Sequence, residues 1–271
     1  MTDTSSEDHS EPWGTYRPNG LQRVLIALTQ NTILQRGAFR GGMTRAIMAL
    51  GAPLDITFRD CCFRIEGRNN LIETGLLTRP GYNAPEIDFL GQVVTDGGVA
   101  VDIGSNVGLY SLPLARAAGP TGRVLAIDAN PSMTRHLAFH AKASGLANLT
   151  SLHMAVGGKE ARVDLRIRLD DVAIVRVEES ATGSVRMLPL TTILSEAGIE
   201  RIDALKIDIE GHEDAALVPF LKQAPDPMLP ARIVIERAGP DGDYPGCVAE
   251  FSRLGYRRVG QTRNNSMYER G

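Results

Sequence analysis

The chain has 271 residues, 43 % of them hydrophobic, and a formal net charge of −3 at pH 7. This length suits one large α/β domain with an N-terminal extension, and the hydrophobic share is sufficient for a core. Because the basic residues are scattered and the net charge is slightly negative, the composition excludes a typical nucleic-acid-binding surface and favours a small-molecule partner.

Residues 1–20 predict a mobile tail. They are polar and acidic, so they lack the basic start and apolar middle of a signal peptide. No apolar stretch of the sequence has the length of a membrane span. The adjacent Cys61 and Cys62 are too close for a relaxed disulfide, and no Cys/His spacing is typical of zinc. We therefore expect a cytoplasmic protein with free thiols.

Residues 21–83 are expected to form an extension made of helices and a hairpin. LQRVLIALTQNTIL has apolar residues at helical spacing, and GAFRGG is expected to break the helix before MTRAIMAL. These helices can pack on the main domain, which we expect, or lie on a membrane. DITFR and CCFRIE alternate around Arg59-Asp60 and predict a hairpin.

Residues 84–271 are expected to form a main domain in which strands and helices alternate. After a helix from Ala84, the expected strands are 98–103, 123–128, LTSLHMAV, 203–209 and 231–236. Further expectations are an antiparallel insertion at 160–188, a helix near His212 that Pro219 limits, and a final hairpin turning at 263–265. Alternation implies parallel strands. The predicted fold class is therefore α/β, a doubly wound sheet with an antiparallel terminal hairpin.

A glycine-rich loop follows the first strand of this domain. It reads Asp102-Ile-Gly104-Ser105-Asn106-Val-Gly108 and stands where open α/β sheets bind ligands. Its glycines allow a sharp turn and a close approach of the backbone. The spacing differs from the G-x-G-x-x-G that a pyrophosphate needs. S-adenosylmethionine has no phosphate and tolerates the asparagine. Asp102 could instead accept turn amides.

An acidic residue ends the second strand. Asp128 can accept both hydroxyls of a ribose, or it can cap the helix that starts near Pro131. Together, the loop, the acid and the fold outline favour a nucleoside cofactor without a phosphate. We assign three more residues to the cofactor site, namely Glu86, Ala129 and Ala155.

The motifs VDIGSNVGLYSLPLA and LKIDIEGHEDAAL stand at the ends of the first and fourth strands. Together they resemble the FkbM-type S-adenosylmethionine-dependent O-methyltransferases. The second fits the family pattern K-[IV]-D-[IV]-E-G-x-E at Lys206, Asp208, Glu210, Gly211 and Glu213. The resemblance covers about residues 84–237 and implies a class I methyltransferase (Rossmann-like) sheet. It also implies a sugar or polyketide hydroxyl as the methyl acceptor.

Two departures from the family pattern stand out. Ser105 replaces the usual Ala of the first motif, which is a mild change. PLTTIL (189–194) has no Asp after the threonine, where relatives commonly read T-L-D-x-L. Any role of that Asp in relatives is therefore not carried over to this chain.

The second motif places candidate catalytic groups at the end of the fourth strand. Methyl transfer from a sulfonium is an in-line displacement, so the protein mainly aligns the reacting atoms, and a base helps an alcohol to attack. His212 is the candidate base, or a solvated residue at a helix start. Asp208 is expected to orient the acceptor or the methionine end of the cofactor, with Lys206 keeping it ionised.

Glu210, and Glu236 at the end of the fifth strand, complete the candidate catalytic group. Glu213 falls in the first turn of a helix, where the dipole stabilises a carboxylate whatever its function. So many carboxylates could also bind Mg²⁺, but no dedicated ligand cage is visible and we assign no metal.

The sequence thus favours an O-methyltransferase behind an N-terminal segment that faces the substrate or a second copy in a homodimer. Two alternatives remain. One is an NAD(P)-dependent oxidoreductase on a similar sheet, which the altered glycine pattern disfavours. The other is a non-catalytic binding module with a methyltransferase fold, which the intact Asp102, Asp128 and Asp208 disfavour.

Overall fold

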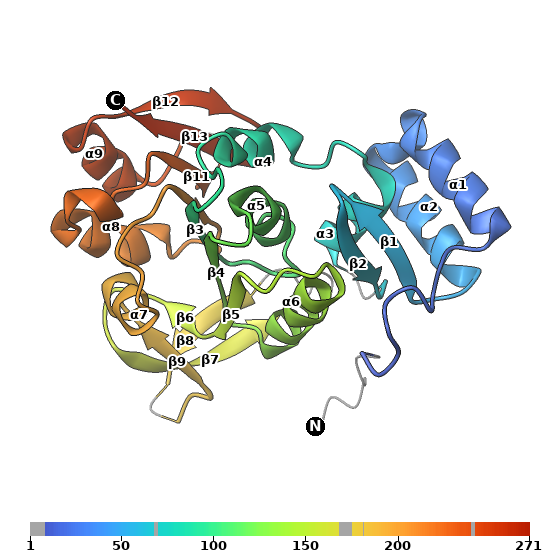
Figure 1. The fold of residues 1–271 in the computed structure, drawn as a ribbon, viewed down its shortest axis with the longest axis horizontal. Helices are drawn as coiled ribbons and strands as arrows, with labels where there is room; N and C mark the ends of the chain where they lie inside the picture. Colours follow the sequence, from blue (N-terminus) through green and yellow to red (C-terminus); the bar gives the residue numbers. More distant parts are fainter. Residues whose placement is uncertain (1–8, 68–69, 168–174, 181, 240–241) are drawn as a thin grey trace.

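The structure, a computed structural model, describes residues 9–67, 70–167, 175–180, 182–239 and 242–271. Its centre is a seven-stranded sheet in the order β12-β13-β11-β10-β3-β4-β5 (Figure 1). From β11 to β5 neighbouring strands are parallel, whereas β13 is antiparallel to both β11 and β12. The strands are β3 (Val99–Ile103), β4 (Arg123–Asp128), β5 (Leu149–His153), β10 (Ala204–Ile207), β11 (Arg232–Glu236), β12 (Tyr256–Gln261) and β13 (Asn265–Arg270). This is the predicted doubly wound sheet with its terminal hairpin.

Helices cover both faces of this sheet. Successive strand residues point to opposite faces, so Val124 and Ala126 join one apolar cluster while Leu125 and Ile127 join the other. The first cluster is completed by α4 (Ala84–Gly91), α5 (Ser111–Ala118) and α6 (Pro131–Ala143). The second is completed by α7 (Leu190–Glu196), α8 (Glu213–Gln223) and α9 (Pro245–Arg253), with the 3₁₀ turn η2 (Asp226–Met228) following α8.

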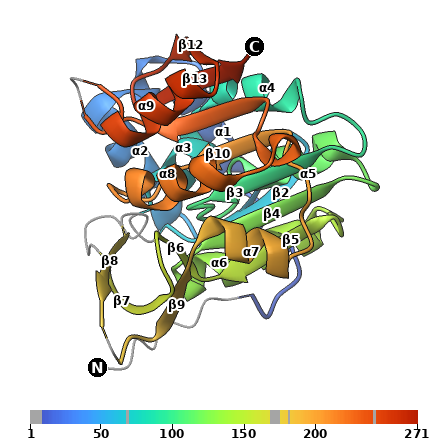
Figure 2. The same cartoon turned by 90° about the vertical axis from the view of Figure 1, so that its left-hand side faces the viewer.

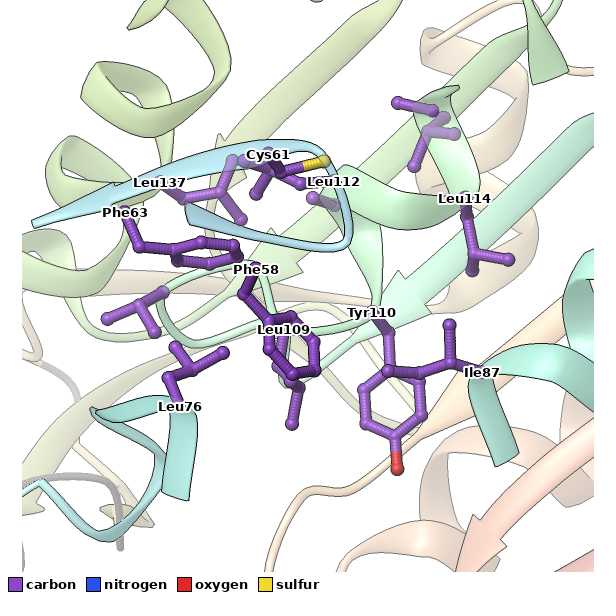
Figure 3. Packing of buried hydrophobic residues seen from close by; sticks show 14 of the residues in the cluster. Phe58, Cys61, Phe63, Leu76, Ile87, Leu109, Tyr110, Leu112, Leu114 and Leu137 are labelled. Atoms are coloured by element: carbon purple, nitrogen blue, oxygen red, sulfur yellow. The ribbon is translucent and has the colours of Figure 1, made fainter. Parts of the chain in front are cut away.

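The N-terminal extension shares the first of these clusters. It consists of α1 (Gly20–Gln30), the 3₁₀ turn η1 (Ile33–Gln35), α2 (Gly37–Ala49), β1 (Leu54–Phe58), β2 (Cys61–Ile65) and α3 (Leu71–Thr78). The β1–β2 hairpin was predicted, and its turn residues Arg59 and Asp60 have φ of 47° and 59°. Figure 3 shows Phe63 of the hairpin beside Leu137 of α6, and Phe58 on the other side of Phe63, near Leu109.

Residues 11–16, which we expected within a mobile tail, are bound to the hairpin. The indole Nε1 of Trp13 donates to the Phe63 carbonyl over 3.1 Å. The buried guanidinium of Arg64 pairs with Asp55 over 2.8 Å and donates to the Glu11 carbonyl over 2.9 Å. The prediction of mobility is therefore wrong for this stretch, whereas residues 1–8 lie outside the described part of the chain.

Two expectations about helix ends are wrong. GAFRGG does not break a helix but begins α2, and the interruption falls at residues 31–36, where the Thr32 side chain accepts from the Leu34 amide. Pro219 lies inside α8 and does not end it. The following Phe220 and Leu221 are each 1 % exposed, and their burial outweighs the lost hydrogen bond.

The expected third strand divides between two sheets. After β5 the chain enters β6 (Ala155–Val156), which joins a four-stranded sheet with β7 (Ala161–Ile167), β8 (Val175–Glu179) and β9 (Val185–Leu188). Strand β7 is antiparallel to β8 and β9, as predicted, and β6 is parallel to β9. This small sheet lies at the opposite side of the molecule from the terminal hairpin (Figure 2). Residues 168–174 and 181 of the predicted insertion lie outside the described residues.

Among the described residues, no helix combines the length and the apolar character needed to cross a bilayer.

Candidate active site

A cavity of about 320 Å³ opens at the carboxyl ends of β3, β4, β10 and β11. Parallel strands bring the residues that follow them to one edge of the sheet. That edge supplies one side of the cavity, and α3 and residues 82–83 supply another. The turn of the terminal hairpin contributes Asn264 and Asn265.

The loop after β3 follows its path because of one glycine and one asparagine. Gly104 has φ of +77°, and a Cβ there would lie 1.8 Å from the Asp208 carbonyl oxygen, so only glycine allows the β3 and β10 loops to touch. Asn106 is also left-handed, with φ of 48°. Its backbone N–H donates to the Asp128 carboxylate over 2.8 Å, and its side-chain oxygen accepts from the Asn70 side chain over 3.1 Å.

Asp128 lies on the cavity wall at the end of β4, with both carboxylate oxygens already accepting backbone amides. Oδ2 accepts from Asn106 and Oδ1 from Asn130, each over 2.8 Å. Burial raises the pKa of this carboxyl to about 6, against the lowering effect of the two amides. Each oxygen keeps a further lone pair. The wall around it is mostly apolar and is formed by Ile127, Ala129, Met154, Ala155 and Val156.

Two polar atoms on the cavity wall are buried and lack a hydrogen-bond partner among the described residues. They are Ser105 Oγ and Asn265 Oδ1, on side chains that are 3 % and 4 % exposed. A buried polar atom without a partner is costly. Their position on the wall fits a ligand with polar groups at this end of the cavity.

The end of β10 carries the ion pair that the sequence predicted. Lys206 is 1 % exposed, and its Nζ donates to Asp208 over 3.2 Å and to the Ile207 carbonyl over 3.1 Å. The same ammonium lies 5.2 Å from the ring centroid of Tyr110. Lys206 and Asp208 both line the cavity.

Glu213 holds the loop that follows. Its two carboxylate oxygens accept from the Ile209 amide over 2.8 Å and from the Gly211 amide over 3.0 Å. Between these amides Glu210 adopts φ of 55°, so the fully buried Glu213 fixes the turn that directs Glu210 to the cavity. His212 precedes α8, makes no capping hydrogen bond with its side chain, and lines the cavity.

Three carboxylates converge beside this loop. One oxygen each from Asp208, Glu210 and Glu236 lies within 4.8 Å of the others, close enough to share a cation. Burial, followed by the charges of Asp208 and Glu210, raises the pKa of Glu236 to about 9. At neutral pH the Glu236 carboxyl is therefore protonated and can donate a hydrogen bond.

Three residues that we assigned to the cofactor lie behind the cavity wall. Asp102 is 1 % exposed and accepts from Ser111 Oγ, and burial raises its pKa to about 6. A Cβ on Gly108 would collide with Leu112, so this glycine serves packing. Glu86 accepts from Asn265 Nδ2 over 3.2 Å and so supports a residue of the wall. The other assigned residues line the cavity, and they are Gly104, Ser105, Asn106, Asp128, Ala129, Ala155, Asp208, Glu210, His212 and Glu236.

Sequence reasoning missed the wall that lies away from the strand ends. Its residues are Leu71, Ile72, Tyr82, Asn83, Tyr110, Asn264 and Asn265. Asn83 shows how they are held, because its side-chain amide donates to the Tyr110 hydroxyl over 2.8 Å. The turn asparagines of the terminal hairpin were the one available signal, since their turn falls at the carboxyl end of the neighbouring β11.

The fold and site define the class of the protein. A doubly wound sheet with an antiparallel terminal hairpin, and a cavity walled by the ends of its parallel strands, are those of a class I, Rossmann-like methyltransferase. The sequence model of the family described as "Methyltransferase FkbM domain" matches residues 102–258. The chain belongs to this family, as its motifs indicated, and the oxidoreductase alternative is set aside. No curated protein matches the chain.

Solved structures with a similar fold are methyltransferases of several kinds. A putative rRNA methylase from Clostridium thermocellum has a TM-score of 0.46 and 13 % identity, covering 70 % of this chain and 97 % of its own. A precorrin-6y C5,15-methyltransferase from Geobacter metallireducens has a TM-score of 0.44 and 14 % identity, and the match covers 71 % of this chain and 90 % of its own. A SAM-dependent O-methyltransferase from Thermotoga maritima has a TM-score of 0.43 and 13 % identity, and the match covers 69 % of this chain and 64 % of its own. Identities this low say nothing about the substrate of this chain.

Proposed function

We propose that this protein transfers the methyl group of S-adenosylmethionine to a hydroxyl oxygen of a small molecule, a saccharide or a polyketide-like compound. The observation that carries the proposal is the meeting of two groups in one cavity. Asp128 stands at the end of β4, and Asp208 and His212 stand at the end of β10. Asp128 suits the ribose of the cofactor, and the pair Asp208 and His212 suits a hydroxyl group that must lose its proton.

The residues present fit this cofactor. Asp128 has lone pairs for the ribose hydroxyls, and Ile127, Met154 and Ala155 offer apolar surface to an adenine ring. Ser105 Oγ, buried and without a partner in the described structure, supplies a polar contact on the same wall. When bound, S-adenosylmethionine supplies a methyl group that is already activated by the sulfonium charge.

The residues at the end of β10 act on the acceptor. We assign the removal of the hydroxyl proton to the His212 imidazole, which is not engaged as a helix cap. Asp208, held by Lys206, orients the acceptor or the methionine end of the cofactor. The protonated Glu236 donates a hydrogen bond to an acceptor oxygen. Mg²⁺ at Asp208, Glu210 and Glu236 is the alternative to this assignment, and a chelator distinguishes the two.

A cytoplasmic location is part of the same proposal. It is supported by the three cysteines, Cys61, Cys62 and Cys247, which are all free thiols, as is usual in a reducing compartment.

Calorimetry tests the cofactor half of the proposal. S-adenosylhomocysteine should bind with an affinity on the order of micromolar, and Asp128→Ala should weaken binding by at least about 1.4 kcal/mol, a factor of ten. Asp128→Asn is the matched control, because it keeps the size of the side chain and removes the charge. Binding of NADH in place of the homocysteine product would contradict the proposal.

Methyl-labelled cofactor tests the acceptor half. The wild type, incubated with fractionated metabolites, should place the label in a saccharide or polyketide fraction through a base-stable ether bond. Label in protein or RNA would overturn the substrate class. Cofactor binding with no acceptor in any fraction would identify a non-catalytic binding module.

A further inference from the structure

The two N-terminal helices bury polar side chains and expose apolar ones. Gln22 and Thr29 are 2 % and 0 % exposed, and the Gln22 amide donates to the Ile47 and Gly51 carbonyls over 3.1 and 2.8 Å. Val24 and Ile33 are 62 % and 68 % exposed. Nine large hydrophobic residues of the described chain are exposed, and six of them lie between residues 20 and 50: Leu21, Val24, Leu28, Ile33, Phe39 and Leu50.

These six residues form what we call the N-terminal apolar face. On α1, Leu21, Val24 and Leu28 follow the i, i+3, i+7 spacing that places side chains on one side of a helix. Phe39 of α2 and Leu50, the C-cap residue of that helix, are about three turns apart on one stripe, and Gly42 and Ala46 between them are exposed too. Ile33 lies in the connection between the helices. We expected this segment to pack its apolar residues on the main domain, and for these six that expectation is wrong.

The charge of the same segment has one sign. Residues 17–54 contain five arginines and no lysine, aspartate or glutamate, in a chain whose net charge is −3. The five are Arg17, Arg23, Arg36, Arg40 and Arg45, and all but Arg40 are exposed. None of them forms a salt bridge within the described part of the chain. The segment that carries the N-terminal apolar face is therefore positively charged, and no salt bridge among the described residues neutralises this charge.

We propose that the N-terminal apolar face docks on the surface of an anionic phospholipid membrane, with α1 and α2 lying along the interface. Helices with exposed apolar stripes and arginines bind in this way, since the side chains enter the acyl boundary while the guanidinium groups meet lipid phosphates. Figure 1 shows α1 and α2 at one end of the molecule, on the outside of the extension. That position leaves them open to a flat surface.

Other occupants fit this surface less well. In a symmetric dimer through this face, each set of five arginines would meet its own copy, and like charges disfavour that contact. A nucleic acid would pair with the arginines and leave six apolar side chains in water. Docking does not depend on the proposed methyl transfer, because the face lies outside the cavity wall.

Vesicle flotation tests the proposal with the full chain. The protein should float with vesicles of phosphatidylglycerol and phosphatidylcholine in equal parts, and it should not float with phosphatidylcholine alone. Salt should weaken binding by screening the arginines. The double variant Ile33→Asp, Phe39→Asp should lower vesicle binding by at least about tenfold. Arg23→Glu with Arg45→Glu should do the same while leaving the apolar residues in place.

Matched controls lie outside the face. Val259 is 50 % exposed on β12, and Arg257 beside it is exposed as well, so Val259→Asp and Arg257→Glu change the same chemistry elsewhere. Both should float like the wild type, and all variants should bind S-adenosylhomocysteine equally. The proposal is overturned if the wild type does not float with anionic vesicles. It is equally overturned if both double variants float normally, or if sedimentation shows a dimer that Ile33→Asp dissociates.

Discussion

The cavity has two walls of different construction. The wall at the strand ends is fixed by the main chain, since Gly104 touches the Asp208 carbonyl and backbone amides bind Asp128 and Glu213. The wall made by the N-terminal extension is held by side chains. Asn70 caps α3 and reaches Asn106, and a buried Arg64–Asp55 pair ties the hairpin to the segment before α1.

This difference separates two tasks. A wall built from backbone contacts keeps its shape through many side-chain changes, which suits a cofactor that never varies. A wall built from side chains can change with the sequence, which suits a part of the cavity that selects the proposed acceptor. Substitutions in each wall should therefore have separable effects.

The largest effect is expected at His212. His212→Ala should lower kcat by a factor of roughly 10² to 10⁴ because the candidate base is missing. Its affinity for S-adenosylhomocysteine should stay near that of the wild type. His212→Gln, which keeps a polar group of similar length, should be equally slow. A loss below about threefold would make His212 an ordinary helix-start residue.

Arg64 tests the extension wall. Arg64→Ala leaves Asp55 buried without its partner and should lower the free energy of unfolding by about 3–5 kcal/mol. The double variant Arg64→Met, Asp55→Asn removes both charges and should recover part of that loss. At a temperature where the variants are folded, calorimetry should show cofactor affinity little changed. A loss of affinity as large as that of Asp128→Ala would mean that the two walls are not separable.

Gly104 tests the wall at the strand ends. Gly104→Ala combines a left-handed φ with a Cβ 1.8 Å from the Asp208 oxygen, so we expect a loss of about 3 kcal/mol in unfolding free energy and weakened cofactor binding. Gly145 is the control, since it has φ of +68° and an added Cβ would meet nothing within 4 Å. Gly145→Ala should cost about 1 kcal/mol and leave binding intact. Equal effects of the two substitutions would exclude the close loop contact.

Glu236 gives the site a pH dependence. Its pKa rises from 4.5 to about 9 in the folded protein, so between these pH values the unfolded state binds fewer protons than the folded state. The free energy of unfolding should therefore fall as pH rises through this window. Glu236→Gln does not titrate, and its melting temperature should fall less over the same range. Parallel melting curves for the two proteins would contradict the raised pKa.

The smallest effect is expected from a reductant. Because the described thiols are free, the melting temperature should be the same with and without dithiothreitol. A drop of many degrees on reduction would reveal a stabilising disulfide.

The two walls of the cavity also differ in how far the sequence predicted their residues. Gly104, Asp128 and Asp208 were predictable because each comes at the end of a strand, and parallel strands carry their ends to one edge. Asn83 was not, since nothing local to it indicates that this part of the extension reaches the cavity. Pro219 misled for a physical reason: helix propensity is a local term, and the burial of Phe220 that outweighs it comes from the tertiary structure.

The packing of Phe63 against Leu137 bears on how this protein can be re-engineered. The extension and the sheet were built around one core, so the hairpin is no exchangeable module. A protein engineer who transplants residues 54–78 from a relative, in order to alter acceptor choice, must also transplant the side chains of α6 that receive it. The same constraint applies in evolution. Recombination that separates residues 54–78 from α6 should be rarer than recombination at the small four-stranded sheet.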